Sequence, residues 1–225
     1  MRINQGWGMT EMSPVGTYNN PAAMRGKPGV PSNRRRLQQG RALFGVDMRI
    51  VDGEGCDLPW DGATFGELLV RGPWICRRYY RADHDATDAD GWFHTGDIAT
   101  IDPDGYLQIT DRSKDLIKSG GEWISSIELE NIAIGHPDVA EAAVIAARHP
   151  RWDERPLLLV VPKVDRGIDA AEVLALFADK VAHLAVPDAI LVVAELPHTA
   201  TGKLLKTALR ERYGDYYVGL QAASA

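Results

Sequence analysis

The stretch "DRSKDLIKSGGEWISSIELE", residues 111–130, separates two kinds of sequence in this chain. Its first part, residues 111–115, is charged and lacks long apolar side chains, as a linker between domains would. Gly120 and Gly121 follow, and two adjacent glycines let the backbone adopt positive φ and change direction. The stretch therefore predicts a linker followed by a turn.

A helix is predicted directly after this turn. Ser125 and Glu128 have the spacing of a capping box, and Gly135 with Pro137 supplies a stop signal. Downstream, apolar alternation and helical periodicity recur in turn, which indicates a small α+β domain from Leu116 onward. The predicted strands span residues 139–147, 155–164 and 189–196. The predicted helices span residues 169–183 and 204–213, and the first of them has Val173, Leu176, Phe177 and Val181 on one face.

Upstream of the linker the sequence is rich in glycine, proline and short alternating runs, which predicts antiparallel β-structure up to about Thr110. Residues 43–52 and 66–72 have the pattern of strands. Residues 98–110 have the pattern of a hairpin, because Pro103-Asp104-Gly105 supplies turn dihedrals between two alternating runs.

The composition excludes several classes of protein. The 225 residues, 45% of them hydrophobic, can bury a core, and a net charge of −6 disfavours nonspecific nucleic-acid binding. Cys56 and Cys76 lack the spacing of a disulfide or zinc site. The longest apolar run, residues 156–162, is too short to span a bilayer, and residues 1–9 lack the apolar core of a signal peptide. We expect a soluble, cytoplasmic protein, and a solvated loop at the basic residues 32–41.

Two motifs of the β-region have both a functional and a purely structural interpretation. In "GWGMTE", residues 6–11, Trp7 can stack on a flat ligand, Thr10 can bond an anion, and Glu11 can hold a hard cation, but a turn before a strand has the same composition. Asp97 and Arg112 stand at the two ends of the predicted hairpin. They could face one ligand, with the carboxylate on a sugar diol, or form a surface ion pair.

Lysines mark two loops of the α+β domain. Lys114 and Lys118 flank the glycine turn and Trp123 follows it, which indicates either a simple connection or a gate over an anionic ligand. In "PHTATGK", residues 197–203, Lys203 stands at the tip of a loop before a helix. A Walker phosphate loop is excluded, because leucine follows this lysine where serine or threonine is required.

Taken together and in order, these motifs resemble the adenylate-forming superfamily, and within it the acyl-CoA synthetases. The resemblance is carried by "GWGMTE", "GELLVRGP", "GWFHTGD", "DRSKDLIKSGGEWISSIELE" and "PHTATGKLLK", and it covers essentially the whole chain. The ending "LRERYGDYY" is similar to the medium- and long-chain fatty-acid–CoA ligase branch. Trp7, where tyrosine is commoner, is similar to ligases for methylmercaptopropionate.

The resemblance implies an α+β fold. Residues 1–111 would be the end of a large domain with a β-barrel-like subdomain, residues 112–115 a hinge, and residues 116–225 a mobile α+β domain. It also implies a two-step reaction, in which a carboxylate attacks ATP to give an acyl-adenylate and pyrophosphate, and the thiol of coenzyme A then displaces AMP. For the first half-reaction it implies Gln5, Gly6 and Trp7 along the adenine and acyl pocket, Thr10 at the α-phosphate and Glu11 at Mg²⁺. Asp97 with Arg112 would bind the ribose, and Lys203 would lie at the adenylation centre. The hinge and gate would contain Lys114, Lys118, Gly121 and Trp123.

The sequence also departs from this family. The serine-, threonine- and glycine-rich phosphate loop and most of the large domain are absent, and "GWGMTE" arrives abruptly within the first residues. We therefore expect the C-terminal half of a ligase that is inactive alone and needs a separate N-terminal half or self-associates. The alternatives are a non-catalytic fragment that binds nucleotide or a partner, a ligase for a short carboxylate, and another acceptor, as in peptide-synthetase domains or luciferases. Arg78, where relatives usually have glycine, is expected to reshape a turn.

Overall fold

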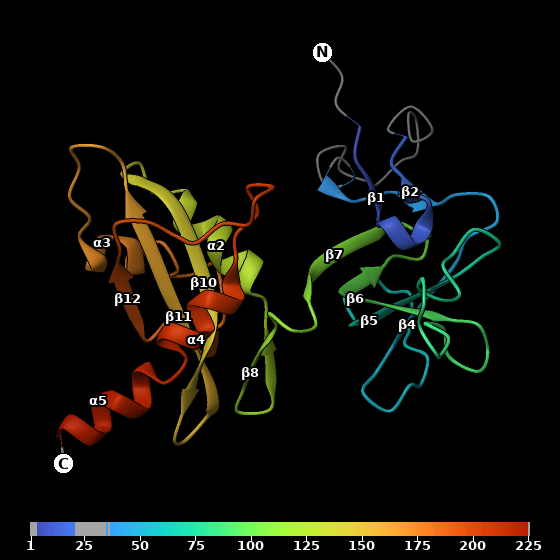
Figure 1. Ribbon diagram of the computed structural model, residues 1–225. Coiled ribbons are helices and arrows are strands. Elements are labelled where there is room, and N and C mark those ends of the chain that lie inside the picture. Colours follow the sequence, from blue (N-terminus) through green and yellow to red (C-terminus); the bar gives the residue numbers. More distant parts are fainter. Residues whose placement is uncertain (1–3, 21–34, 36, 225) are drawn as a thin grey trace. The chain divides into compact units, whose positions relative to one another are not determined.

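The computed structural model describes residues 4–20, 35 and 37–224 (Figure 1). The chain divides into two compact units, residues 1–113 and 114–225. This division falls inside the segment 112–115, whose action as a hinge stays a prediction. Among the described residues, no helix is both long and apolar enough to cross a membrane.

The first unit is built almost entirely of antiparallel strands. Its larger sheet has the order β4-β5-β6-β7, and a smaller sheet has the order β1-β2-β3. Alternate residues of the larger sheet, such as Ile50, Leu68 and Ile101, are fully buried on one face. Neither sheet closes into a barrel within the described part of the chain, so the barrel-like expectation is wrong for this structure. The elements are β1 (Gly6–Gly8), the 3-10 helix η1 (Thr10–Met12), β2 (Val15–Tyr18), β3 (Arg41–Ala42), β4 (Asp47–Val51), β5 (Phe65–Arg71), β6 (Phe93–Ile101) and β7 (Leu107–Arg112).

The predicted hairpin and strand of this unit have different outcomes. The hairpin is confirmed as β6–β7, and its turn is held because Asp102 Oδ1 accepts from the N–H groups of Asp104 and Tyr106, both at 3.0 Å. The strand predicted over residues 43–52 is interrupted. Gly45 adopts φ +85°, so only Asp47–Val51 continues as a strand.

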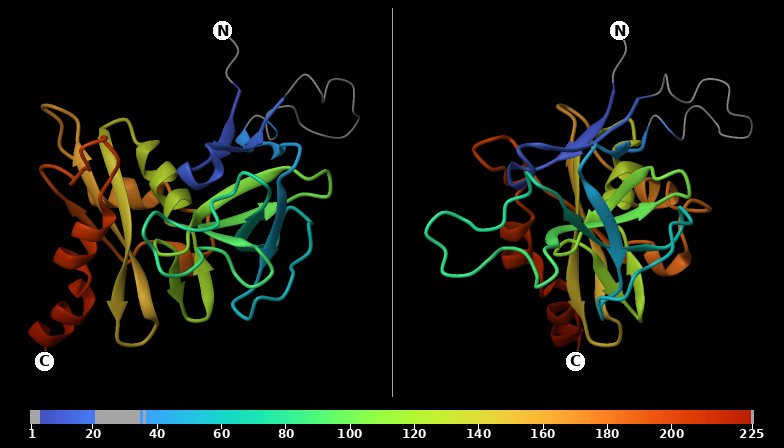
Figure 2. Two further views of the ribbon diagram at one scale, coloured as in Figure 1. Left: turned by 45° about the vertical axis from the view of Figure 1, so that its right-hand side comes forward. Right: turned by 90° about the vertical axis from the view of Figure 1, so that its right-hand side faces the viewer.

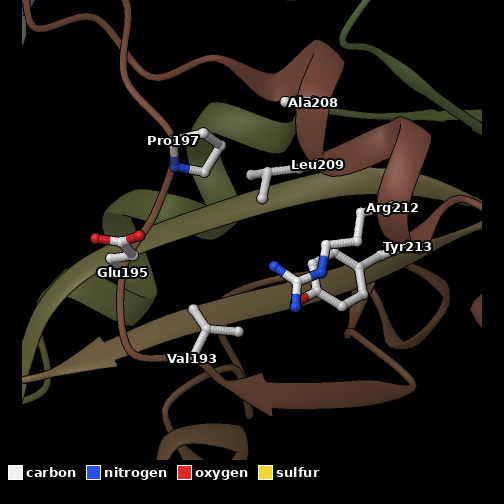
Figure 3. A pocket seen from close by; sticks show the side chains of 7 residues that line it. All are labelled: Val193, Glu195, Pro197, Ala208, Leu209, Arg212 and Tyr213. Atoms are coloured by element: carbon white, nitrogen blue, oxygen red, sulfur yellow. The ribbon is translucent and has the colours of Figure 1, made fainter.

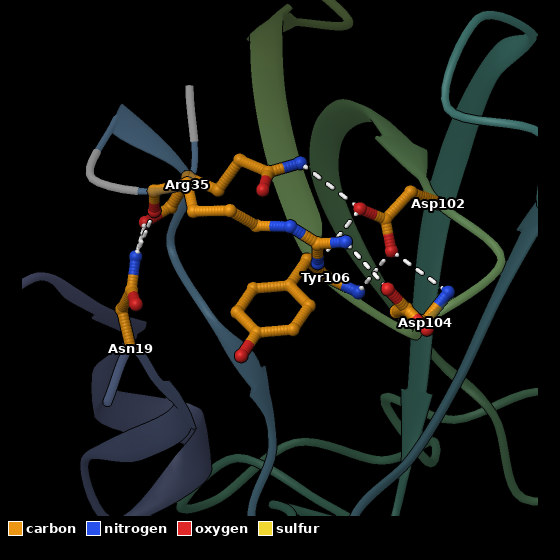
Figure 4. A network of polar contacts seen from close by, with 6 residues as sticks. Asn19, Arg35, Asp102, Asp104 and Tyr106 are labelled. Atoms are coloured by element: carbon orange, nitrogen blue, oxygen red, sulfur yellow. Dashed lines mark hydrogen bonds and ion pairs between the residues drawn. The ribbon is translucent and has the colours of Figure 1, made fainter. Parts of the chain in front are cut away.

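The basic segment at residues 32–41 is not simply a solvated loop (Figure 4). Arg35 is buried, its Nη1 lies 3.0 Å from Asp102 and its Nη2 lies 2.6 Å from Asp104. The guanidinium carbon also lies 4.1 Å from the centre of the Tyr106 ring. Two carboxylates and an aromatic ring thus surround Arg35 at the tip of the β6–β7 hairpin. Residues 32–34 and 36 lie outside the described residues.

The second unit is a sheet covered by helices on both faces (Figures 1 and 2). Its strand order is β10-β11-β8-β9, and β12 pairs in parallel with β11. Val144 and Leu158 pack under α2 and α3, whereas Ile145 and Leu157 pack under α4 and α5. The elements are β8 (Ile117–Ser119), β9 (Glu122–Ile124), α2 (Ser126–Ile134), β10 (Val139–His149), β11 (Asp153–Pro162), α3 (Ala170–Ala175), the 3-10 helix η3 (His183–Ala185), β12 (Ala189–Val192), α4 (Lys206–Tyr213) and α5 (Tyr216–Ser224).

The predicted helix caps at Ser125 and Asp169 are confirmed, and so is the predicted end of α2 at Gly135. Ser125 Oγ accepts from Glu128 N–H at 3.2 Å, and Asp169 caps α3 through Ala171 N–H at 2.8 Å. The helix predicted over 169–183 is wrong in length, because i→i−3 hydrogen bonds replace α-helical ones after Ala175 and Asp179 adopts φ +61°. The strand predicted over 189–196 ends at Val192, and α5 was not predicted.

Candidate functional site

The "GWGMTE" motif forms β1 and η1, which pack tightly against β2. A β-carbon at Gly8 would lie 1.9 Å from the carbonyl oxygen of Pro14, so only glycine allows this approach. Trp7 is held in register by its backbone N–H, which donates to Thr17 Oγ1 at 3.2 Å. The glycines thus bring the tryptophan side chain onto the core of the first unit. The structural alternative, a turn before a strand, fits the second half of the motif, because η1 is a short helical turn that precedes β2, whereas residues 6–8 form a strand.

Trp7, Asp97 and Arg112 form one cluster. Trp7 Nε1–H donates to Asp97 Oδ2 at 2.8 Å, and Arg112 Nε lies 3.8 Å from Asp97 Oδ1. Asp97 and Arg112 are also register partners across β6 and β7. The Asp97 side chain is 15% exposed. Its burial raises the pKa of this carboxyl, while the Trp7 hydrogen bond and the Arg112 charge oppose the rise. Each carboxylate oxygen can accept further hydrogen bonds, so a diol can still bind at the open side.

Glu11 has a partner that the sequence did not indicate. The hydroxyl of Tyr79 donates to Glu11 Oε1 at 2.8 Å, and this bond raises the pKa of the phenol, which therefore stays a donor. The tyrosine belongs to a loop in which Arg77 and Arg78 both bind Asp85 and lower its pKa. Arg78 is not among the residues with positive φ, so its backbone does not occupy the left-handed region that favours glycine.

The remaining predicted residues of the first unit lie near this cluster in the chain. Thr10 is exposed on η1, and Gly6 is exposed on β1. Gln5 is half-buried and its backbone carbonyl accepts from Asn19 N–H at 2.8 Å. No group of three or more acidic, histidine or cysteine side chains gathers in a metal-holding arrangement in the described part of the chain. A lone carboxylate such as Glu11 fits Mg²⁺ when nucleotide phosphates and water supply the other ligands.

In the second unit the glycine turn forms a hairpin between β8 and β9, rather than a plain strand-to-helix loop. Gly120 and Gly121 adopt φ +58° and +88°. Lys118 and Trp123 are direct register partners across this hairpin, and both side chains are exposed. Lys114 is exposed in the turn that precedes β8. The structure thus pairs the lysine and the tryptophan that the sequence placed on either side of the turn.

Lys203 stands at the end of a turn that is closed by its own backbone. Thr199 N–H donates to the Lys203 carbonyl at 2.7 Å, and Lys203 N–H donates to Thr199 Oγ1 at 3.1 Å. Gly202 adopts φ +78° to complete the turn. The Lys203 side chain is exposed and has no hydrogen bond or ion pair with the described residues. By contrast, Lys206 is bound 2.7 Å from Glu130, so the structure separates a free ammonium from a structural one.

A pocket of about 170 Å³ lies beside the segment that leads to this turn (Figure 3). Leu209 and Tyr213 of α4 form one wall, and Val193 and Pro197 form the other. Lys203 does not line it. The pocket therefore lies between α4 and the segment that leads to Lys203, and Lys203 is not part of it.

Each of the two units contains a match to a known protein family. Residues 1–80 match the AMP-binding enzyme family, and residues 128–203 match the AMP-binding enzyme C-terminal domain. The chain belongs to the AMP-binding enzyme family. The order of the two matches is the order of the two compact units. The mixed α+β fold that the resemblance implied is confirmed.

Individual relatives of this AMP-binding enzyme are CoA ligases. The medium-chain-fatty-acid–CoA ligase of Ectopseudomonas oleovorans is 52% identical over 96% of the chain, and the 3-methylmercaptopropionyl-CoA ligase of Ruegeria pomeroyi is 53% identical over 95%. The crystal structure of ATP-bound MatB from Rhodopseudomonas palustris matches 96% of the chain with a TM-score of 0.81 and 32% identity, and 42% of MatB is covered. The chain spans 40% of the length of either relative.

Proposed function

We propose that this AMP-binding enzyme chain carries the ribose-binding and lysine-bearing part of an acid–thiol ligase, which joins a carboxylic acid to coenzyme A at the expense of ATP. The observation that carries the proposal is the free Lys203 ammonium on one compact unit, with the Trp7–Asp97–Arg112 cluster complete on the other. The names of the relatives support the CoA ligase class.

In the first half-reaction a carboxylate oxygen attacks the α-phosphorus of ATP, forming an acyl-adenylate and releasing pyrophosphate. Asp97 accepts hydrogen bonds from the ribose hydroxyls, and Thr10 donates to the α-phosphate. Lys203 bridges the two anions, and a fixed cation is most valuable where charge is concentrated in the transition state. Mg²⁺, held through Glu11, would screen the phosphate charge. Gln5, Gly6 and Trp7 line the adenine and acyl side, with Arg112 beside the ribose.

In the second half-reaction the thiol of coenzyme A attacks the acyl carbon and AMP leaves. Lys203 must withdraw to make room, so we place a hinge at residues 112–115, with Lys114 at its centre. The β8–β9 hairpin, with Gly121 in its turn, then presents Lys118 and Trp123 to coenzyme A. Domain rotation between half-reactions is a known way to build two sites from one set of residues.

We propose a medium- or long-chain fatty acid as substrate, because a relative named as a medium-chain-fatty-acid–CoA ligase is 52% identical. A short thioether acid such as 3-methylmercaptopropionate is the second candidate, because a relative with that substrate in its name is 53% identical. The two free cysteines suit the reducing cytoplasm, where we place the enzyme.

The decisive experiment replaces the matching part of the Ectopseudomonas oleovorans ligase by this chain. We expect the chimera to form AMP and acyl-CoA from octanoate, ATP, Mg²⁺ and coenzyme A, as measured by mass spectrometry. The remainder of that ligase alone and this chain alone are the controls, and we expect neither to release AMP. A folded chimera without acyl-CoA would contradict the proposal.

A nucleotide-binding role without catalysis is the alternative, because the Trp7–Asp97–Arg112 cluster lies wholly within one unit. Isothermal titration of the 225-residue chain with AMP and with ATP tests it. Binding without turnover, together with an inactive chimera, would favour this alternative.

We propose that the first unit binds another protein, which is either a separate N-terminal half or a second copy of the chain. Phe44 is 98% exposed and Tyr80 is 86% exposed, and large exposed aromatic side chains favour association. We expect self-association of the chain in light scattering, and less of it in Phe44→Ser with Tyr80→Ser. A monomer at all concentrations would contradict this.

A further inference from the structure

The tip of the β10–β11 hairpin, residues 149–154, is bonded to the glycine turn of the β8–β9 hairpin. Gly120 N–H donates to the carbonyl of Trp152 at 3.0 Å, and Lys118 N–H donates to Glu154 Oε2 at 2.9 Å. Between these two bonds, Ser119 is the register partner of Asp153. The turn is therefore fixed on both sides of Ser119.

The Trp152 ring lies in contact with Gly120. A β-carbon at Gly120 would approach Cε3 of this ring to 3.0 Å, and Gly120 also needs its φ of +58°. The guanidinium carbon of Arg151 lies 4.6 Å from the centre of the same ring, a distance at which a cation is attracted to an aromatic face. The indole is thus held by its own hairpin and supports the turn.

Arg155 fixes the turn from inside the unit. It is 4% exposed and binds Asp188 through two contacts of 2.6 Å each. Its remaining donors reach the carbonyls of Leu184 and Val186 and, at 3.2 Å, Ser119 Oγ. A guanidinium is a planar fork of donors, and one that is bonded on all sides in this way has little conformational freedom. Ser119 is therefore bound to a rigid point of the core.

We propose that Trp152, Glu154 and Arg155 are positioning residues, which hold the Gly120–Gly121 turn in one shape and thereby set the placement of Lys118 and Trp123. This inference rests on the proposed function, in which those two side chains meet coenzyme A. None of the contacts described above involves Lys203, whose turn is closed by Thr199. Loosening the glycine turn should therefore slow thioester formation and leave adenylation nearly unchanged.

The kinetic test uses the chimera with Ser119→Ala, Glu154→Ala or Trp152→Ala. We expect thioester formation from preformed acyl-adenylate to fall by roughly ten- to a hundredfold, since small misplacements have effects of this size. Pyrophosphate exchange, which reports adenylation, should change by less than about twofold, a selectivity that general destabilisation would not produce. Trp60→Ala in the first unit is the matched control for Trp152→Ala. Equal loss of both half-reactions would overturn the inference.

A structural readout on the 225-residue chain keeps the inference independent of activity. Hydrogen exchange at the amides of residues 118–122 should accelerate in each variant, while the amides paired between β10 and β11 keep their protection. Unchanged exchange at 118–122 would overturn the positioning role even if the chimera is active. An inactive wild-type chimera contradicts only the proposed function, because the exchange experiment still decides the positioning role.

Discussion

At the scale of single residues, Asp97 shows how a binding site can be held at the expense of stability. Its carboxylate is largely buried, and burial raises its pKa despite the Trp7 hydrogen bond and the Arg112 charge. A carboxyl whose pKa is higher in the folded than in the unfolded chain favours folding only while it is protonated. Near neutral pH it is ionised, so the folded state bears a desolvation cost that a bound ribose would offset.

Asp97→Asn should therefore stabilise the first unit at neutral pH and abolish nucleotide binding. Because the pKa of Asp97 is raised, the stability gain should shrink as the pH falls through the pKa of the folded carboxyl, and it should vanish below 3.8, where the wild-type carboxyl is protonated in both states. Urea unfolding of both proteins between pH 4 and 7 measures this. A gain that does not depend on pH would show that ionisation is not its cause.

Lys203→Ala in the chimera should slow acyl-adenylate formation by roughly 10²–10³-fold, the usual loss for one donor to a developing charge. Thioester formation from preformed acyl-adenylate should be largely spared, because we propose that the lysine withdraws before that step. The two half-reactions are measured separately by pyrophosphate exchange and by acyl-CoA release.

Lys180→Ala is the matched control, because Lys180 is also exposed in the second unit and lies outside the proposed machinery. Equal loss of both half-reactions in Lys203→Ala would mean that its role is structural.

At the scale of elements, the connection between α2, α4 and β10 decides how the lysine turn is carried. Lys206, the first residue of α4, binds Glu130 of α2 at 2.7 Å and Ser126 Oγ at 2.6 Å. Glu130 Oε1 also accepts from Val144 N–H of β10 at 2.8 Å. This ion pair, three residues after Lys203, therefore joins two helices and is bonded to the middle of β10.

Lys206→Met should destabilise the second unit by about 3 kcal/mol, because breaking a buried pair leaves a buried charge without its counter-ion. The side chains of Lys206 and Glu130 are only 10% and 13% exposed. Glu130→Gln in the same chain should recover part of the loss, since an amide can still accept from Val144 without a charge. Urea unfolding followed by circular dichroism measures both. A double variant less stable than Lys206→Met would contradict the ion-pair explanation.

Elements also show where sequence reasoning stops. Ser125 and Asp169 were correctly placed at helix starts, because a capping side chain bonds a backbone N–H two or three residues away. The predicted end of α3 was wrong, because the chain changes to i→i−3 hydrogen bonds after Ala175 and Asp179 adopts positive φ. Packing onto the sheet decides these changes, and local sequence patterns do not reveal them. Phe177 is fully buried beyond the end of α3, so its burial agrees with the apolar pattern although the helix is shorter than predicted.

At the scale of the whole molecule, the chain consists of two units that each have their own buried core. The first unit has one apolar cluster around β4–β7, and the second has a cluster on either face of β10 and β11. A unit with both sheet faces covered buries enough apolar surface to fold without its neighbour.

Residues 114–225 expressed alone should fold and unfold cooperatively in urea, with circular dichroism of a mixed α+β protein. Lys206→Met should shift the unfolding midpoint of this unit in the same direction as in the whole chain. A disordered fragment would show that the second unit depends on the first.

Sequence patterns alone predicted the family, the β-rich and α+β halves, the helix caps and the hairpin turn at Asp104-Gly105. These rest on local patterns and on the order of motifs, which need no knowledge of distant neighbours. Tertiary structure alone decided that Tyr79 binds Glu11, 68 positions away, that Trp7 binds Asp97, and that Lys206 is paired while Lys203 is free. Such pairings depend on how strands and helices pack, because packing brings side chains that are distant in sequence within reach of one hydrogen bond.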